Sequence, residues 1–327
     1  MQRILQALVL VVAGVAPLYA SVDSALLALV PSGSKVLASI DVDRARNSEF
    51  GQYALRQVDN GDQGFQSFIQ TTGFDPRRDI QQFVFATPNP GARGADARFA
   101  ILLRGTFDQG RLEKAAQSKG ATVRTLGGVN IFTDRSHDGH TGFAFPEVGV
   151  AILADVHTLE EVIANRGNSS TLDPEMLELV SRAGTNNDMW FVSLVPGSFL
   201  ANHMPSEARS TSAGPQALQA VLRSSGGVQF GTDVRVFFDA DTRSPQDAAS
   251  LADVIRFVAS TIQMQRTKDP RATLLAPALD SISLSSSGSS VHVSVSIPER
   301  TLEQLTELRP SSSQSATPRS RVGTGRR

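Results

Sequence analysis

The chain contains no cysteine, and this absence removes several classes of protein at once. Without a thiol, its 327 residues cannot perform cysteine-based catalysis, hold a cysteine-ligated zinc ion or carry an iron–sulfur cluster. The fold has no disulfides to rely on, so its apolar cores alone must hold it together. A lipid-anchored lipoprotein is excluded because it needs a cysteine to carry the lipid.

The chain also lacks an excess of charge of either sign. Its 31 basic and 32 acidic residues leave a formal net charge of −1. A dedicated nucleic-acid-binding protein shows a basic surplus, so we expect no nucleic-acid partner. Hydrophobic residues make up 40% of the chain, which is enough to bury real cores, and the length indicates about two domains.

Sequence motifs that indicate a bound cofactor or a catalytic nucleophile are missing as well. The sequence holds no Gly-x-Ser-x-Gly elbow, no phosphate-binding loop and no dinucleotide-binding glycine pattern after a strand. We therefore expect no cofactor and no catalytic residue that the sequence alone identifies. A non-catalytic protein is favoured, and the question of an enzymatic activity stays open.

The best candidate for a metal site is the stretch "TDRSHDGH". It supplies Asp134, His137, Asp138 and His140, and carboxylate and imidazole groups are suitable ligands for zinc or a similar ion. A loop of polar residues around Asp138 and Gly139 is equally typical of a long hairpin connection. An exported hydrolase that uses a metal at this loop is therefore the alternative hypothesis for the function.

The first twenty residues have the pattern of a secretory signal peptide. Arg3 gives a positive start, Ile4–Ala16 is an uncharged apolar run, and Ala20 is a suitable last residue before cleavage. We expect export to the periplasm or the medium. An uncleaved anchor is the alternative, although Pro17 and Asp23 interrupt the run before the roughly 20 apolar residues that a spanning helix needs.

Alternating and helical patterns predict an α+β protein with two similar units, each a mainly antiparallel sheet with helices packed on one face. The first unit spans residues 21–166 and the second spans residues 187–308. Residues 167–186 form a linker with a short helix, and 309–327 form a disordered tail rich in serine, proline and arginine. The tail arginines are either solvated or in contact with an anionic surface.

Individual elements carry clear signals. Hairpins are predicted over 121–134, 141–155 and 281–298, and a long amphipathic helix over 244–265. A short helix that ends in glycines is predicted over 214–227. The stretches "AILADVHTLEEVI" and "VSVSIPERTLEQL" both run from strand to helix through Thr-Leu-Glu, which favours an internal repeat over an accidental likeness.

The stretch "TGFDPRRDI" contains two aspartates and two arginines but predicts a helix-to-strand connector and no catalytic cluster. Gly73 ends one helix, and Asp75 followed by Pro76 fits the cap and first turn of the next. Together with "VPSGSKVLASIDVDRARNSEFGQ", this stretch resembles the opening of exported bacterial proteins of unknown function. The resemblance covers about residues 22–105 and implies export and a repeated α+β build, without any activity or functional residue.

These observations favour an exported, non-catalytic protein of the cell envelope. Its partner would be a protein or another envelope component, bound through sheet surfaces or through the cleft between the two units. The sequence gives no indication of the oligomeric state.

Overall fold

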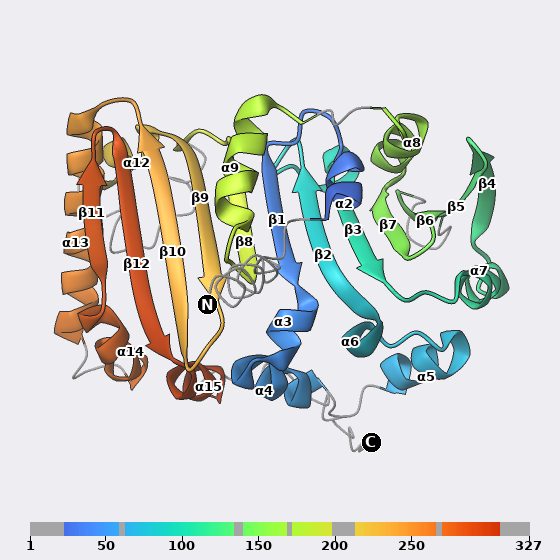
Figure 1. Ribbon diagram of the computed structural model, residues 1–327, viewed down its shortest axis with the longest axis horizontal. Helices are drawn as coiled ribbons and strands as arrows, with labels where there is room; N and C mark the ends of the chain where they lie inside the picture. Colours follow the sequence, from blue (N-terminus) through green and yellow to red (C-terminus); the bar gives the residue numbers. More distant parts are fainter. Residues whose placement is uncertain are drawn as a thin grey trace, which may run out of the picture.

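The computed structural model describes residues 23–58, 63–133, 140–168, 172–197, 213–265 and 270–307. They form one continuous antiparallel sheet of 12 strands, in the order β11-β12-β10-β9-β8-β1-β2-β3-β7-β6-β5-β4, with helices around it (Figure 1). The α+β class and the antiparallel pairing are confirmed. The strands are β1 Val36–Asp41, β2 Ile80–Thr87, β3 Ala100–Gly105, β4 Thr122–Leu126, β5 Val129–Thr133, β6 Thr141–Glu147, β7 Val150–Asp155, β8 Met189–Ser193, β9 Val221–Gln229, β10 Asp233–Thr242, β11 Ser283–Ser287 and β12 Ser290–Pro298.

Twelve α-helices connect these strands in the described part of the chain. They are α2 Ser24–Ala28, α3 Val42–Asn47, α4 Glu49–Val58, α5 Gln63–Thr72, α6 Pro76–Asp79, α7 Gln109–Ser118, α8 Val156–Ala164, α9 Pro174–Gly184, α12 Ala213–Gln219, α13 Pro245–Gln265, α14 Pro270–Asp280 and α15 Glu299–Glu307. None of these helices is long and apolar enough to cross a lipid bilayer.

The strands of residues 21–166 and of residues 187–308 meet in the middle of this sheet. Strand β1 pairs with β8, with Val36 opposite Ser193 and Ala38 opposite Phe191. The segment 167–186, predicted as a linker, contains helix α9, whose Leu179 packs in the same core as Leu37 of β1. The two parts of the chain therefore share one sheet and one core at this junction.

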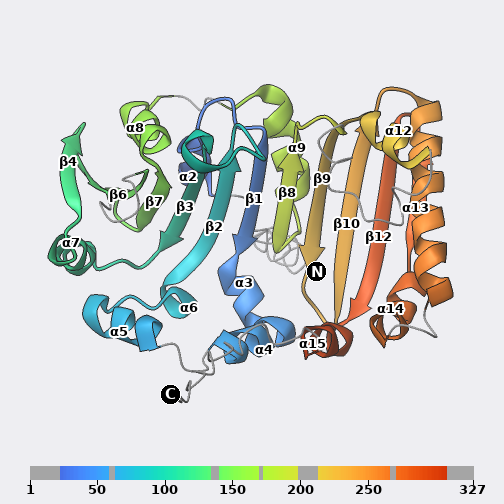
Figure 2. The ribbon, with the colours of Figure 1, turned by 180° about the vertical axis from the view of Figure 1, so that it is seen from behind.

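Within residues 21–166, helices α2 and α8 cover one face of the sheet and α5 and α7 the other, so the prediction that helices pack on one face is wrong for this unit. Within residues 187–308, α12 and α13 lie on the same face. Trp190 packs in the core under α2, α8 and α9, whereas the next residue, Phe191, points to the opposite face. Through β9, Phe191 lies in the same cross-strand row as Phe238, which packs against the core of α13. Figure 2 shows α13 in front of the sheet in the view where α9 lies behind it. We call these two surfaces the α9 face and the α13 face.

The middle of the α13 face is open in the described part of the chain. One cross-strand row there consists of four residues that are only half-buried: Ala38, Phe85, Ile101 and Phe191. The helices over this face, α13 on one side and α5 and α7 on the other, leave β1 and β2 between them uncovered (Figure 2).

The connector over residues 72–80 has the predicted structure. Gly73 has a φ of 73° and follows α5, and the Asp75 carboxylate accepts a hydrogen bond from the Arg77 backbone N–H at 3.0 Å at the start of α6. Asp79 accepts from the Arg78 guanidinium at 2.7 Å, which lowers the pKa of Asp79. The charged groups of this turn pair with each other, as expected of a structural connector.

The helix predicted over 214–227 is wrong in its second half. Helix α12 ends at Gln219, and Gly226 and Gly227 lie inside strand β9. A Cβ atom on Gly226 would lie 2.4 Å from the Phe191 ring and 2.7 Å from the Phe237 carbonyl oxygen. These glycines therefore allow close packing inside the sheet. The sequence pattern had indicated the end of a helix at the same position.

Candidate functional site

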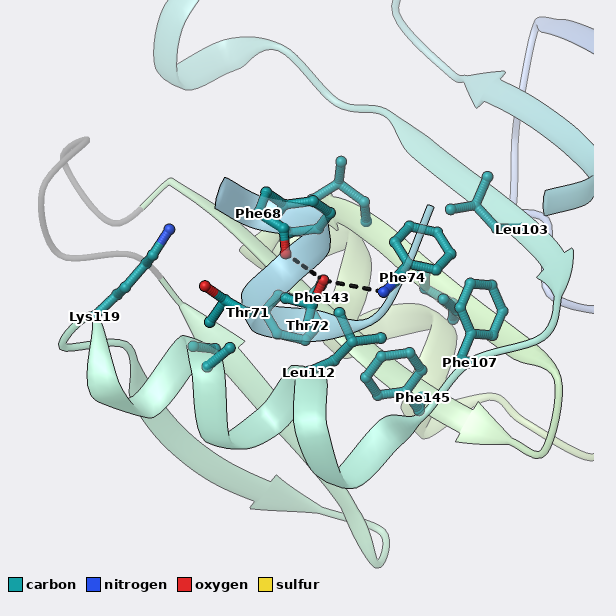
Figure 3. Close-up of a pocket in the computed structure, with 15 residues that line it drawn as sticks. Phe68, Thr71, Thr72, Phe74, Leu103, Phe107, Leu112, Lys119, Phe143 and Phe145 are labelled. Carbon is teal, nitrogen blue, oxygen red and sulfur yellow. Dashed lines mark hydrogen bonds between the residues drawn. The ribbon is translucent and has the colours of Figure 1, made fainter. Parts of the chain in front are cut away.

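An apolar cavity lies on the α13 face, between the sheet and helices α5 and α7. Its volume is about 410 Å³. Figure 3 shows its side chains, which come from α5, α7, β3, β6, β7 and the loops that follow α5 and β3. We call this cavity the phenylalanine pocket, after its five rings: Phe68, Phe74, Phe107, Phe143 and Phe145.

The five rings form one chain of aromatic contacts. Ring centroids lie 6.2 Å apart for Phe68 and Phe74, 5.4 Å for Phe74 and Phe107, 5.8 Å for Phe107 and Phe145, and 5.8 Å for Phe143 and Phe145. Such tilted and edge-on pairs contribute about 0.5–1.5 kcal/mol each beyond the burial of their area. The wall of the phenylalanine pocket is therefore built before any ligand enters.

The pocket is open because of the composition of α7. Its inward face carries Leu112, Ala115 and Ala116, which have helical spacing, and the two alanines fill little of the space above the sheet. Helix α7 packs mainly on α5, whereas α13 packs directly on β10, β11 and β12. Space therefore remains between α7 and the sheet, whereas α13 fills the corresponding space above strands β10, β11 and β12.

An arginine holds the two covering helices together. The Arg111 guanidinium donates to the carbonyl oxygens of Gln70 and Thr71, each at 3.3 Å, at the C-terminal end of α5. A Cβ atom on Gly73 would lie 2.6 Å from Arg111 Nη1, so a glycine there leaves room for this contact. Helices α5 and α7 cover the pocket, and the Arg111 contacts and the ring contacts hold them in place. A direct interface between α7 and the sheet is not needed for this.

The two threonine hydroxyls of the pocket have no proton left to donate to a ligand. The hydroxyl of Thr72 donates to the Phe68 carbonyl oxygen at 2.7 Å and accepts from the Phe74 N–H at 3.2 Å (Figure 3). The hydroxyl of Thr71 donates to the Ser67 carbonyl oxygen at 2.8 Å. Among the described residues, Lys119 is the one charged group that lines the cavity, and it occupies the C-cap position of α7.

The predicted metal cluster falls mainly outside the described residues. Asp134, His137 and Asp138 lie there, whereas His140 is described and lines a depression of about 320 Å³ together with His157. Asp155 in the same depression is already engaged, because it accepts from the N–H groups of Phe99 and Thr158. Within the described part of the chain, no three histidine or acidic side chains are grouped to hold a metal ion, and the four-residue site stays a prediction.

A histidine–aspartate pair lies on the α9 face of the second half. His292 Nδ1 is 2.7 Å from an Asp239 carboxylate oxygen across β12 and β10, and both side chains are exposed, at 46% and 39%. Among the described residues, His292 has no hydrogen bond to a serine that would act as a nucleophile. The pair is a surface cross-strand contact of the kind that stabilises sheets.

Sequence reasoning did not find the phenylalanine pocket. Its rings come from segments as far apart as Phe68 and Phe145, and no local pattern links them. The one local signal was the small inward face of the helix at 109–118, where Ala115 and Ala116 occupy positions that a core helix fills with larger side chains.

Comparison of the chain with protein-family models, curated proteins and solved structures finds no match. The resemblance noted for residues 22–105 accordingly brings no function to this chain, and the function has to be argued from the site.

Proposed function

We propose that this chain is an exported, non-catalytic protein of the cell envelope that binds a small apolar molecule in the phenylalanine pocket. The observation that carries the proposal is a cavity of about 410 Å³ walled by five phenylalanines. Ligand pockets have volumes of about 300–1,000 Å³ and mostly apolar walls. The five rings are only half-buried, and the pocket is open to solvent on one side. An apolar ligand that covers these rings therefore removes apolar surface from water.

A fluorescent-probe titration tests the proposal. N-phenyl-1-naphthylamine is uncharged and becomes brighter in apolar surroundings, so we expect saturable binding at one site per chain. Ala116→Phe fills the cavity and should weaken binding by about tenfold or more, since losing the burial of two methylene-sized groups costs roughly 1.6 kcal/mol and each 1.4 kcal/mol is about tenfold in affinity. Gln117→Phe places the same ring on the exposed side of α7 and should leave affinity unchanged. Equal affinities for the wild type and Ala116→Phe would refute the proposal.

Export is supported by the pattern of residues 1–20, which lie outside the described part of the chain. Expression of the full chain in a bacterial host, followed by cell fractionation and N-terminal sequencing, tests it. A mature chain that starts at Ser21 in the exported fraction is expected. An unprocessed chain in the cytoplasm would contradict this part of the proposal.

We further propose that the two halves are similar units related by a two-fold axis between β1 and β8. Outward from the centre, the order β1-β2-β3-β7-β6 corresponds to β8-β9-β10-β12-β11, and the hairpin β4-β5 is an addition to the first half. An experimental structure in which these two sets of five strands superpose after a rotation of about half a turn would support the proposal, and strands that do not superpose would exclude it.

A further inference from the structure

We propose that the ligand of the phenylalanine pocket is a single-chain amphiphile whose polar end is an anion, and that Lys119 binds that anion. This inference rests on the proposed function and adds the chemical class of the ligand. It follows from the shape of the pocket, its hydrogen-bonding capacity and the position of its one charge.

The pocket has an apolar end and a charged end. Figure 3 shows Lys119 at one side of the cavity, with Leu103 and Phe107 at the opposite side. A ligand that fills this space has its hydrocarbon among the rings and its polar end at Lys119. The volume corresponds to about a dozen methylene-sized groups, taking roughly 30 Å³ for each by analogy with the volume of a water molecule in the liquid. One alkyl chain of ten to twelve carbon atoms fits this room, whereas a two-chain lipid does not.

Hydrogen bonding disfavours ligands with a polar middle. The Thr72 hydroxyl already has a donor and an acceptor partner, and the Thr71 hydroxyl proton is used by Ser67. A sugar or nucleotide ring placed among the phenylalanines would leave its own polar groups without partners, at a cost of about 1–3 kcal/mol for each group. An unbranched hydrocarbon has no polar groups that need hydrogen-bond partners.

The charge of Lys119 selects the head group. Within the described part of the chain, the Lys119 ammonium forms no ion pair, and its side chain is exposed at the pocket rim. Its aliphatic stem lines the apolar wall, and its charged end stays in water, as is usual for lysine at such boundaries. A carboxylate or phosphate at the end of the ligand would meet this ammonium as a charge-assisted partner. A cationic head group would be repelled.

Displacement of bound N-phenyl-1-naphthylamine by four amphiphiles with the same ten-carbon chain tests the inference. The amphiphiles are decanoate, decyl phosphate, decanol and decyltrimethylammonium. Both anions should bind about three- to fivefold more tightly than decanol, which is the range that an exposed ion pair supplies. The cation should bind more weakly than decanol, and 1 M salt should remove these differences. Comparison of the two anions separates a carboxylate source from a phosphate source.

Variants of Lys119 test whether this residue causes the preference for anionic ligands. Lys119→Met keeps the length and loses the charge, so it should bind decanol like the wild type and lose the preference for anions. Lys119→Glu should prefer the cation. Lys114→Met, a neutralised lysine on the same helix that does not line the pocket, should behave like the wild type. Equal binding of decanol and decanoate by the wild type, or an anion preference that persists in Lys119→Met, would overturn the inference while leaving the proposed function standing. Failure of decanol to displace the probe would overturn the inference, and failure of the probe itself to bind would overturn both.

Discussion

Single carboxylates fix the junctions between strands and helices in this protein. Asp155 ends β7 and is 8% exposed, and it accepts hydrogen bonds from Thr158 N–H at 3.0 Å and from Phe99 N–H at 2.9 Å. The first bond caps α8, and the second holds the segment that leads into β3. One side chain therefore links a helix start to a neighbouring strand.

We expect Asp155→Ala to lower the free energy of unfolding by about 2–4 kcal/mol, because it removes a helix cap and leaves the Phe99 N–H without its partner. Asp173→Ala is the matched control, since Asp173 caps α9 through Glu175 N–H alone and is exposed. Its cost should be about 1 kcal/mol. Urea denaturation of both variants measures the difference, and similar costs would mean that the Phe99 contact contributes nothing.

A second carboxylate makes stability depend on pH. Glu299 begins α15 and is 4% exposed, and its burial, together with the nearby Glu49 carboxylate, raises the pKa of Glu299 above its usual value. The folded chain therefore holds this proton more tightly than the unfolded chain, so ionisation of Glu299 costs stability as pH rises from about 4.

Glu299→Gln removes this cost because its amide is uncharged at every pH. We expect the variant to gain thermal stability relative to the wild type at pH 7, and the difference to shrink as pH falls to about 4. Melting temperatures of both proteins between pH 4 and pH 7 test this. A difference that does not change with pH would show that Glu299 titrates like a solvated carboxylate.

At the scale of elements, helix α9 shows how a segment with linker composition becomes part of a core. One side of α9 carries four residues with helical spacing that are buried against the sheet: Met176, Leu179, Val180 and Ala183. The polar stretch before Pro174 hid this amphipathic face from the sequence analysis, because serine, asparagine and glycine are typical of surface loops.

We expect Leu179→Ala to lower the free energy of unfolding by about 3 kcal/mol, since the side chain is 1% exposed and its removal leaves a cavity. Leu177→Ala, two positions earlier on the same helix, removes a side chain that is 38% exposed and should cost about 1 kcal/mol or less. Guanidinium denaturation compares the two. Equal, small costs would mean that α9 is a peripheral linker.

Elements with strong local signals were predictable, and features that depend on distant contacts were not. The hairpins β4-β5, β6-β7 and β11-β12 were found because two alternating runs flank a turn. Helix α13 was predictable because Ser244 and Asp247 give a start signal before an apolar stripe, and the Ser244 hydroxyl accepts from the Asp247 N–H at 3.1 Å. The faces that helices cover, the close approach at Gly226 and the phenylalanine pocket all depend on which segments meet in space, and sequence periodicity does not contain that information.

At the scale of the whole molecule, the continuous sheet makes the two halves depend on each other. The pairing of β1 with β8 lies at the centre of the 12 strands, and Leu37, Leu179 and Val192 belong to one core. Separation of the halves would expose the edges of β1 and β8, and such unpaired edges promote association.

We therefore expect the chain from Ser21 onward to unfold in one cooperative transition when followed by circular dichroism and by Trp190 fluorescence. Fragments 21–166 and 167–308 should be insoluble when expressed alone and should form a one-to-one complex when expressed together. A soluble, folded monomer of either fragment would show that the halves are independent domains.

A crystal structure of the chain with dodecanol tests ligand binding in the phenylalanine pocket, because it locates the ligand without depending on a variant. We expect electron density for the alkyl chain among Phe68, Phe107, Phe143 and Phe145, with the hydroxyl end toward Lys119. Density on the open row of Phe85 and Phe191, or no bound alcohol at saturating concentration, would contradict this expectation.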